Sequence, residues 1–331
     1  MIDRDWIGKA QVRDWTRGDI IALLNATPAE EVAIFAAARE ERARHFGDKC
    51  FLRAVVEFAN RCTCNCLYCG MRRDLVTTGR YILTREEIIT IAEETVRMNI
   101  PTIFLQSAED KGYAVEWLVD IVREIHDRLG LKVLLCIGKL TDQELRDLRQ
   151  AGASRMIIKH ETADSELFKR LKPDLNLEER IEDLLRAKKA GFEIGSGPIL
   201  GLPGQTIESL ADDILLMKRM GVKMSSVSIF MPHKDTPLAD APPGDVQLGC
   251  RFIAAMRLAL HDTLIPSTST FERALTGGQV RALNAGANVI TVNMTPEQCK
   301  GEYQLYSDRY YVRLEHALDC IKRAGLKPAA E

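Results

Sequence analysis

Residues 61–74 read RCTCNCLYCGMRRD, a stretch that places four of the nine cysteines of this 331-residue chain within eight residues. The other five cysteines are scattered, and each is most simply a small buried hydrophobic residue. No secretion signal precedes the stretch, and in a reducing compartment clustered thiols bind metal more often than they form disulfides. The stretch therefore predicts a metal centre.

The spacing of these cysteines narrows the kind of metal centre. Cys62, Cys66 and Cys69 form C-x3-C-x2-C, with Cys64 inside the first gap. A structural zinc site needs a fourth protein ligand, and no second close pair of Cys or His follows. Three thiolates can instead hold three irons of a 4Fe–4S cluster and leave the fourth iron open. Zinc remains an alternative, as does a non-catalytic iron–sulfur electron carrier with four cysteines per cluster. Cys64 is not expected to be a ligand.

Around this stretch, short β-rich runs alternate with longer amphipathic runs. Helices are expected over 17–46, and capping boxes start two more, with Thr84 facing Glu87 and Thr141 facing Glu144. Eight strands are expected, over 51–58, 102–105, 132–137, 155–159, 193–200, 225–230, 264–267 and 288–292. This alternation favours an α/β fold, a TIM-type (β/α)8 barrel with an N-terminal helical extension. An open doubly wound sheet remains possible.

No low-complexity linker divides the chain, which predicts a single domain. We expect N-terminal helices over 1–48, the barrel over 49–300 and a C-terminal helical segment over 301–331. In such barrels, catalytic groups gather on the loops that leave the carboxyl ends of the strands. The cysteine stretch directly follows the first expected strand, which predicts that the chemistry takes place there.

Composition excludes several classes of partner. The net charge is −2, with 45 basic and 47 acidic residues, so no broad positive field favours nucleic acid. The chain has no apolar run long enough for a membrane span and no signal peptide at its start. A cytoplasmic enzyme acting on a small molecule is the expectation.

The cysteine spacing, with the aromatic Tyr68 just before Cys69, resembles the signature of the radical S-adenosylmethionine (SAM) enzymes. The resemblance implies that Cys62, Cys66 and Cys69 ligate a 4Fe–4S cluster whose open iron is chelated by SAM. It implies reductive cleavage of SAM to methionine and a 5′-deoxyadenosyl radical, with the electron supplied by a reductase such as flavodoxin or ferredoxin. A barrel interior suits so reactive a species because it excludes water.

The same resemblance implies SAM contacts at other strand ends. The segment LQSAED (105–110) corresponds to the one that holds the amino group of SAM, GPILGLPGQT (197–206) to the one near the adenine, and HETAD (160–164) to a possible ribose contact. The implied cofactor residues are Tyr68, Ser107, Glu109, Glu161, Arg180, Leu200 and Gly201. Without the resemblance, Arg180 is most simply a surface ion-pair partner of Glu179 or Asp183, and His160 a core histidine.

Eight segments in order, among them CLYCGMRRD, MPHKDTPLAD and YQLY, resemble a narrower group, the HydE group of FeFe-hydrogenase maturases. This implies a small sulfur-bearing substrate, a cysteine–iron complex, and other hydrogenase maturases as partners. The implied substrate residues are Arg155, Lys159, Thr268, Ser269, Tyr303 and Tyr306. Lys159 stands where this group commonly has Arg, so carboxylate recognition can differ. A 3-methylornithine synthase-like mutase and a HydE-like enzyme with another substrate stay open as alternatives, with biotin synthase more distant. A single cluster is expected.

Overall fold

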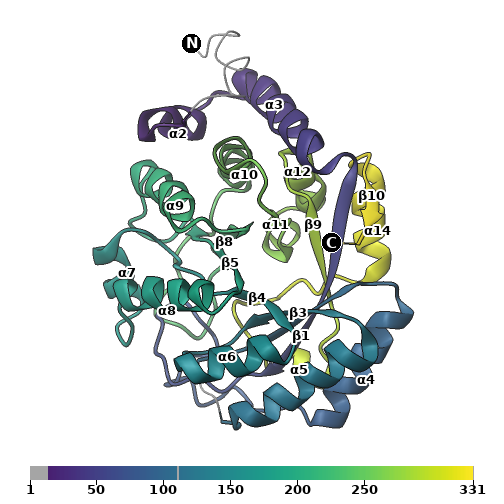
Figure 1. The fold of residues 1–331 in the computed structure, drawn as a ribbon. Helices are drawn as coiled ribbons and strands as arrows, with labels where there is room; N and C mark the ends of the chain where they lie inside the picture. Colours follow the sequence, from purple (N-terminus) through teal and green to yellow (C-terminus); the bar gives the residue numbers. More distant parts are fainter. Residues whose placement is uncertain (1–13, 110–111, 331) are drawn as a thin grey trace.

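Eight of the strands run parallel in one curled sheet, two short strands form a second parallel sheet, and helices surround them (Figure 1). This computed structural model describes residues 14–109 and 112–330, so the part of the predicted N-terminal helical region at 1–13 lies outside the described residues. The strands are β1 (Lys49–Ala59), β2 (Thr102–Ser107), β3 (Lys132–Cys136), β4 (Ala153–Ile157), β5 (Glu193–Ser196), β6 (Ile199–Leu200), β7 (Met224–Ser225), β8 (Ser228–Ile229), β9 (Val289–Asn293) and β10 (Lys327–Ala329).

The main ladder runs in the order β10-β1-β2-β3-β4-β5-β7, and β9 pairs with β1. Single bridges join Met224 to Leu264 and Pro266 to Val289, so residues 264–266 link β7 to β9 and lead the sheet back to β1. Sequential parallel strands with helices between them are the arrangement of a TIM-type fold, and this prediction is confirmed.

Three details of the sheet differ from the expected strands. The run over 193–200 divides into β5 and β6 at Gly197 and Pro198, because Pro198 has no N–H for a ladder bond. Position 197 requires glycine, since a Cβ there would come within 1.8 Å of the Ser226 carbonyl oxygen. Residues 264–267 form single bridges instead of a strand. The strand β10 was not predicted, and it pairs with the start of β1.

The helices begin where the capping patterns place them. Thr84 and Thr141 each accept a hydrogen bond from the backbone N–H three residues on, as predicted. The helices are α2 (Arg17–Leu24), α3 (Pro28–Phe46), α4 (Arg85–Arg97), α5 (Val115–Leu129), α6 (Asp142–Gln150), α7 (Ser165–Leu171), α8 (Leu177–Lys189), α9 (Ile207–Met220), α10 (Val246–Leu260), α11 (Ser269–Ala274), α12 (Gly278–Asn284), α13 (Glu297–Lys300) and α14 (Leu314–Arg323). The helices predicted over 17–46 are thus α2 and α3, which pack on α9 and α10.

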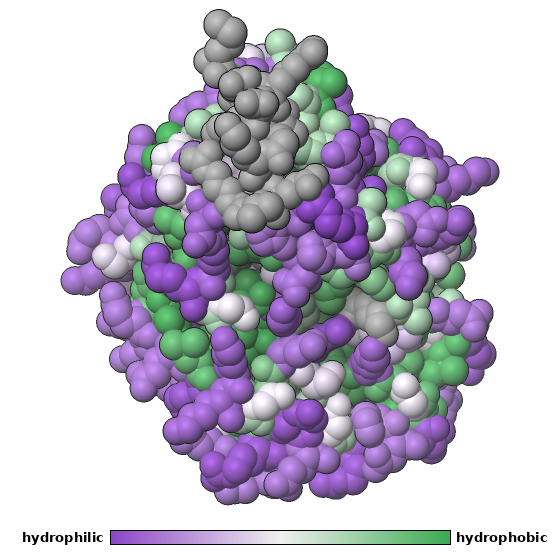
Figure 2. Space-filling model, turned by 45° about the horizontal axis from the view of Figure 1, so that its top comes forward, coloured by the Kyte–Doolittle hydropathy of each residue, from purple (hydrophilic) through white to green (hydrophobic). Residues whose placement is uncertain are grey.

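The strands of the main sheet form the buried centre of the protein, and β1 shows this most clearly. Every residue of β1 after Lys49 is buried, as expected for a parallel strand covered on both faces. On the face shown in Figure 2, hydrophilic residues predominate and hydrophobic ones are scattered among them. Within the described ranges, no helix combines the length and the apolar character that crossing a bilayer requires.

Candidate active site

The cysteine stretch forms an irregular loop after β1, at the carboxyl ends of the strands. Cys66 is buried, Cys62 and Cys69 are half-buried, and all three are free thiols. All three line one cavity of about 350 Å³, a size typical of sites for small molecules and cofactors. The C-x3-C-x2-C spacing therefore brings three thiols to a single cavity.

A hydrogen-bond network built on the exposed Arg80 and the buried Asn60 holds the shape of this loop. The guanidinium of Arg80 donates from Nη1 to the carbonyls of Asn60 and Met71, both at 2.9 Å, and from Nη2 to the carbonyl of Arg72 at 2.9 Å. The side chain of Asn60 donates to the carbonyl of Glu302 at 2.7 Å, which ties the loop to the C-terminal segment. Sequence reasoning did not identify Arg80 or Asn60, because neither belongs to a recognisable motif.

The three thiols have different electrostatic surroundings. A hydrogen bond from the Cys64 thiol stabilises the Cys62 thiolate and lowers the pKa of Cys62 below its usual value. The same bond raises the pKa of Cys64. Burial raises the pKa of Cys69 to about 12 and that of Cys66 above its usual value. Cys62 is therefore the thiol that ionises first, and metal binding must overcome the burial of the other two.

The cavity collects most of the side chains that the sequence singled out. Those lining it are Cys62, Cys66, Tyr68, Cys69, Ser107, Glu109, Lys159, Glu161, Arg180, Thr268, Ser269, Tyr303 and Tyr306. Most come from loops and strand ends around the sheet, while Arg180 lies on α8 and Ser269 begins α11. Three predicted residues, Arg155, Leu200 and Gly201, do not line it.

Arg155 lies on β4, two residues before the cavity-lining Ile157 and therefore nearer the amino ends of the strands. Its side chain is 12% exposed and pairs with Glu193 on the neighbouring β5, with Nε and Oε2 2.7 Å apart. The ion pair with Glu193 therefore accounts for the position of the Arg155 side chain, and no ligand in the cavity is needed to explain it.

Ile199, rather than Leu200 or Gly201, reaches the cavity from the glycine-rich segment. The N–H of Gly201 donates to Gln205 Oε1 at 2.7 Å, and its φ of 94° is one that glycine adopts without strain. A Cβ on Gly201 would lie 2.3 Å from the Cα of Gly244. The close approach of two backbones therefore requires this glycine.

Arg180 faces the cavity, so the surface ion pair considered for it is not what the structure shows. Its Nη1 lies 2.6 Å from Glu109 Oε1, and its Nε donates to the Lys159 carbonyl at 2.5 Å. Burial raises the pKa of Glu109, but the charge and hydrogen bond of Arg180 outweigh it and hold that pKa below its usual value. Both groups are thus charged at the cavity wall.

A second charged group centres on Glu161, which has an unusual positive φ of 63°. Its carboxylate lies 3.4 Å from Lys159 Nζ and 3.7 Å from Lys172 Nζ. Lys172 is 5% exposed, and its ammonium lies 3.3 Å from the Tyr68 hydroxyl, beside the cysteine loop. Lys172 was missed in the sequence, where it is a single charged residue after α7 with no motif around it.

The neighbouring His160 is a core histidine, as the sequence predicts when the family resemblance is set aside. Its Nδ1 lies 2.8 Å from Ser196 Oγ, and its Nε2 lies 3.2 Å from Asp213 Oδ1. The side chain is 2% exposed and does not line the cavity. We conclude that His160 supports the strand end that carries Glu161.

The C-terminal segment closes another side of the cavity. Arg309 joins it to β1 through a buried ion pair, with Nη2 2.6 Å from Glu57 Oε1, and also donates from Nη1 to the Tyr303 carbonyl at 2.5 Å. Tyr306 bonds Ser269 through their hydroxyls at 3.1 Å. The predicted tyrosines are therefore positioned by a pair, Glu57 and Arg309, that sequence reasoning missed.

Comparison with known proteins agrees with this geometry. Residues 56–217 match the model of the radical SAM superfamily, and residues 226–327 match that of the Biotin and Thiamin Synthesis associated domain. The [FeFe] hydrogenase maturase subunit HydE of Thermotoga maritima is 39% identical over 322 residues, which is 97% of this chain and 92% of the relative. A biotin synthase of Carboxydothermus hydrogenoformans is 26% identical over 93% of both chains.

Among solved structures, methylornithine synthase (PylB) superimposes with a TM-score of 0.86 at 25% identity, covering 98% of this chain and 97% of that one. The fold and the family thus agree with the interpretation of the cysteine spacing. Membership implies SAM and an iron–sulfur cluster, and the three thiols that share one cavity fit such a cluster. The chain belongs to the radical SAM superfamily and, within it, to the family of the hydrogenase maturase subunit HydE.

Proposed function

We propose that this enzyme cleaves SAM reductively at a single 4Fe–4S cluster held by Cys62, Cys66 and Cys69. It then acts on a small sulfur-bearing substrate, a cysteine–iron complex, in the assembly of the FeFe-hydrogenase cofactor. When bound, the cluster and SAM supply the electron transfer and the 5′-deoxyadenosyl radical. The observation that carries the proposal is that three thiols line one cavity together with two sets of paired charges, Glu109 with Arg180 and Glu161 with Lys159 and Lys172.

The pair Glu109 and Arg180 suits the amino-acid end of SAM. The guanidinium can form a charge-assisted bond to the SAM carboxylate, and the carboxylate of Glu109 can accept from the SAM ammonium. Their 2.6 Å contact fixes both groups beside the cysteine loop before any ligand enters. In the same cavity, Glu161 suits the ribose hydroxyls, with Lys172 keeping its carboxylate in place. Ser107 and Ile199 complete the cofactor side.

The substrate side lies between α11 and the C-terminal segment. Thr268, Ser269, Tyr303 and Tyr306 offer hydroxyls there, and Lys159 adds a charge. The Lys159 ammonium lies 3.2 Å from Ser228 Oγ. Hydroxyls beside an ammonium suit a small anionic ligand such as a carboxylate or a cyanide group. A flavodoxin or ferredoxin as reductase, other hydrogenase maturases as partners and the cytoplasm as compartment belong to this proposal.

A 3-methylornithine synthase-like activity is the second candidate, favoured by the fold shared with PylB. Of the described residues that line the cavity, Glu57, Glu109 and Glu161 are the carboxylates, and each faces a cation of the chain. Both candidate substrates carry an amino-acid ammonium group, so these carboxylates do not separate them. The HydE-type substrate takes precedence because HydE is 39% identical to this chain, against 29% for a 3-methylornithine synthase of Methanosarcina acetivorans.

Anaerobic reconstitution with iron and sulfide tests the cluster. Wild type and Cys64→Ala should both hold a full cluster whose electron paramagnetic resonance spectrum changes when SAM is added, whereas Cys66→Ala should not hold one. With dithionite, the first two should release 5′-deoxyadenosine. A full cluster in the variant that lacks Cys62, Cys66 and Cys69, or the loss of the cluster in Cys64→Ala, would contradict the proposed ligand set.

The physiological role needs a second experiment. Deletion of the gene in a host that makes an FeFe-hydrogenase should abolish hydrogenase maturation. The wild-type gene should restore it, and the Cys66→Ala gene should not. Full hydrogenase activity after deletion, in a host without a second copy, would reject the maturation role and leave the radical chemistry standing.

A further inference from the structure

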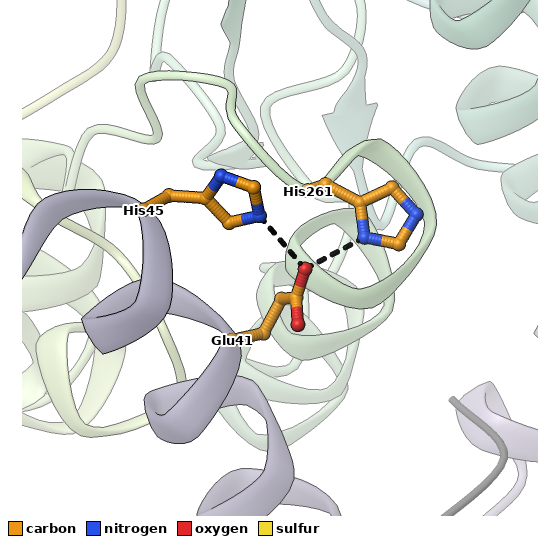
Figure 3. A group of neighbouring side chains, drawn as sticks. All are labelled: Glu41, His45 and His261. Atoms are coloured by element: carbon orange, nitrogen blue, oxygen red, sulfur yellow. Dashed lines mark hydrogen bonds and ion pairs between the residues drawn. The ribbon is translucent and has the colours of Figure 1, made fainter. Parts of the chain in front are cut away.

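Three metal-ligating side chains meet at the junction of α3 with the end of α10, outside the cavity (Figure 3). Glu41 and His45 lie on α3, and His261 caps α10. Glu41 Oε1 is 3.0 Å from His45 Nε2 and 2.7 Å from His261 Nδ1. The three donor atoms all lie within 4.8 Å of one another. One carboxylate oxygen and two imidazole nitrogens therefore converge on one point.

The backbone presents these groups from two separate elements. Glu41 and His45 are four residues apart on a helix, so their side chains share a face. His261 has a φ of 53° and a ψ of −80°, a positive-φ conformation that is uncommon outside glycine, and the buried Arg257 donates from Nη1 to its carbonyl at 2.6 Å. This turn directs the imidazole of His261 toward α3.

The two carboxylate oxygens of Glu41 have different partners, and one of them faces both imidazoles. Glu41 is about 5% exposed, and its Oε2 lies 2.6 Å from Arg44 Nη1, so Oε1 is the oxygen that faces the histidines. A second carboxylate, Asp262, lies near His45. Oε1 of Glu41 is thus the carboxylate oxygen positioned as a monodentate ligand.

We propose that Glu41, His45 and His261 bind a divalent first-row metal ion, Zn²⁺ in the first place, which joins α3 to the end of α10. Two imidazole nitrogens and one carboxylate oxygen form a ligand set that Zn²⁺ uses in proteins, with water in the fourth position. The side chains of His45 and His261 are 33% and 36% exposed, so water reaches the site. On metal binding, each imidazole would ligate through the nitrogen that faces Glu41 and carry its proton on the other ring nitrogen.

The consequence is a crosslink that closes a long segment of chain. His261 lies 220 residues from Glu41, and the ion would anchor the N-terminal helical extension to the barrel. An ion that binds the folded chain and not the unfolded one raises stability by mass action. The site is independent of the cysteine cavity, so the proposal does not depend on the proposed function.

The test measures zinc bound to the cluster-loaded protein under anaerobic conditions. Protein is equilibrated with micromolar free Zn²⁺ in a nitrilotriacetate buffer, filtered, and analysed for metal by mass spectrometry. Wild type should retain about one zinc ion per chain more than the variant His45→Gln/His261→Asn. The unfolding temperature of the wild-type protein should rise when Zn²⁺ is added and fall back to its zinc-free value when a chelator is added. The unfolding temperature of the variant should not change.

These substitutions separate a metal site from a hydrogen-bonded cluster. Gln and Asn keep a donor for Glu41, and Asn is among the residues that adopt a positive φ, as position 261 requires, more often than most. The exposed His126, which pairs with Asp127, gives the control His126→Gln, which should bind zinc like wild type. Should the double variant be unstable, His45→Gln alone should lose the extra zinc. Equal zinc binding by wild type and the folded variant would overturn the proposal.

Discussion

The buried ion pair between Glu57 and Arg309 makes the most quantitative prediction, because one substitution should strand a charge inside the protein. The side chains are 2% and 7% exposed, and Nη2 and Oε1 are 2.6 Å apart. Removing one partner of such a pair costs about 3–5 kcal/mol. In Arg309→Met, Glu57 Oε2 keeps donors from Asn293 and Thr295 at 3.2 Å each. We therefore expect the lower end of that range, about 3 kcal/mol.

Urea unfolding followed by tryptophan fluorescence and circular dichroism measures this loss. The matched control is Arg97→Met, which breaks an exposed pair with Glu94 whose side chains are 61% and 42% exposed and should cost about 0–0.5 kcal/mol. The double variant Glu57→Gln/Arg309→Met should be more stable than the sum of the two single losses, because no charge is then stranded. If Arg309→Met is as mild as Arg97→Met, the ion pair does not hold the C-terminal segment.

Three further outcomes follow from the cavity. Arg180→Lys should weaken SAM binding to the cluster-loaded protein about tenfold or more by calorimetry, since an ammonium cannot reproduce both guanidinium bonds; unchanged affinity would refute this. In cluster-free protein near neutral pH, iodoacetamide should label Cys62 before Cys69, because the pKa of Cys62 is lowered and that of Cys69 is about 12. The rate of Cys62 labelling should fall as the pH drops below the Cys62 pKa, whereas the preference over Cys69 should fade only as the pH rises toward the Cys69 pKa. Equal labelling near neutral pH would contradict this. Lys172→Met removes a buried cation beside the loop, so a redox titration should find a more negative cluster potential; a potential at or above the wild-type value would exclude this role.

The fold was predictable because its signals are local. Alternating strand and helix patterns, with capping boxes at Thr84 and Thr141, indicated the parallel α/β architecture before any contact was known. The strand β10 was not predicted, because three residues at the end of the chain carry too little periodicity. Its pairing with β1 depends on closure of the whole sheet.

The candidate site also has a part that the sequence predicted and a part that it missed. Spacing within one loop indicated three thiols for one metal centre, since eight residues of chain cannot separate them far. It could not distinguish residues that reach the cavity from those nearby, so Arg155, Leu200 and Gly201 were grouped with residues that line it. Which of two neighbouring residues faces inward is decided by strand breaks and close backbone contacts, such as that of Gly201 with Gly244.

By itself, the sequence determined the family, the cysteine loop and the alternation of most strands and helices, because each of these signals lies within a short stretch of consecutive residues. Only the tertiary structure paired Lys172 with Tyr68, 104 residues away, and Arg309 with Glu57, 252 residues away. Charged side chains so far apart in sequence carry no signal of their partners. They meet because the curled sheet brings the ends of its strands around one cavity, and burial then makes each unpaired charge too costly to leave alone.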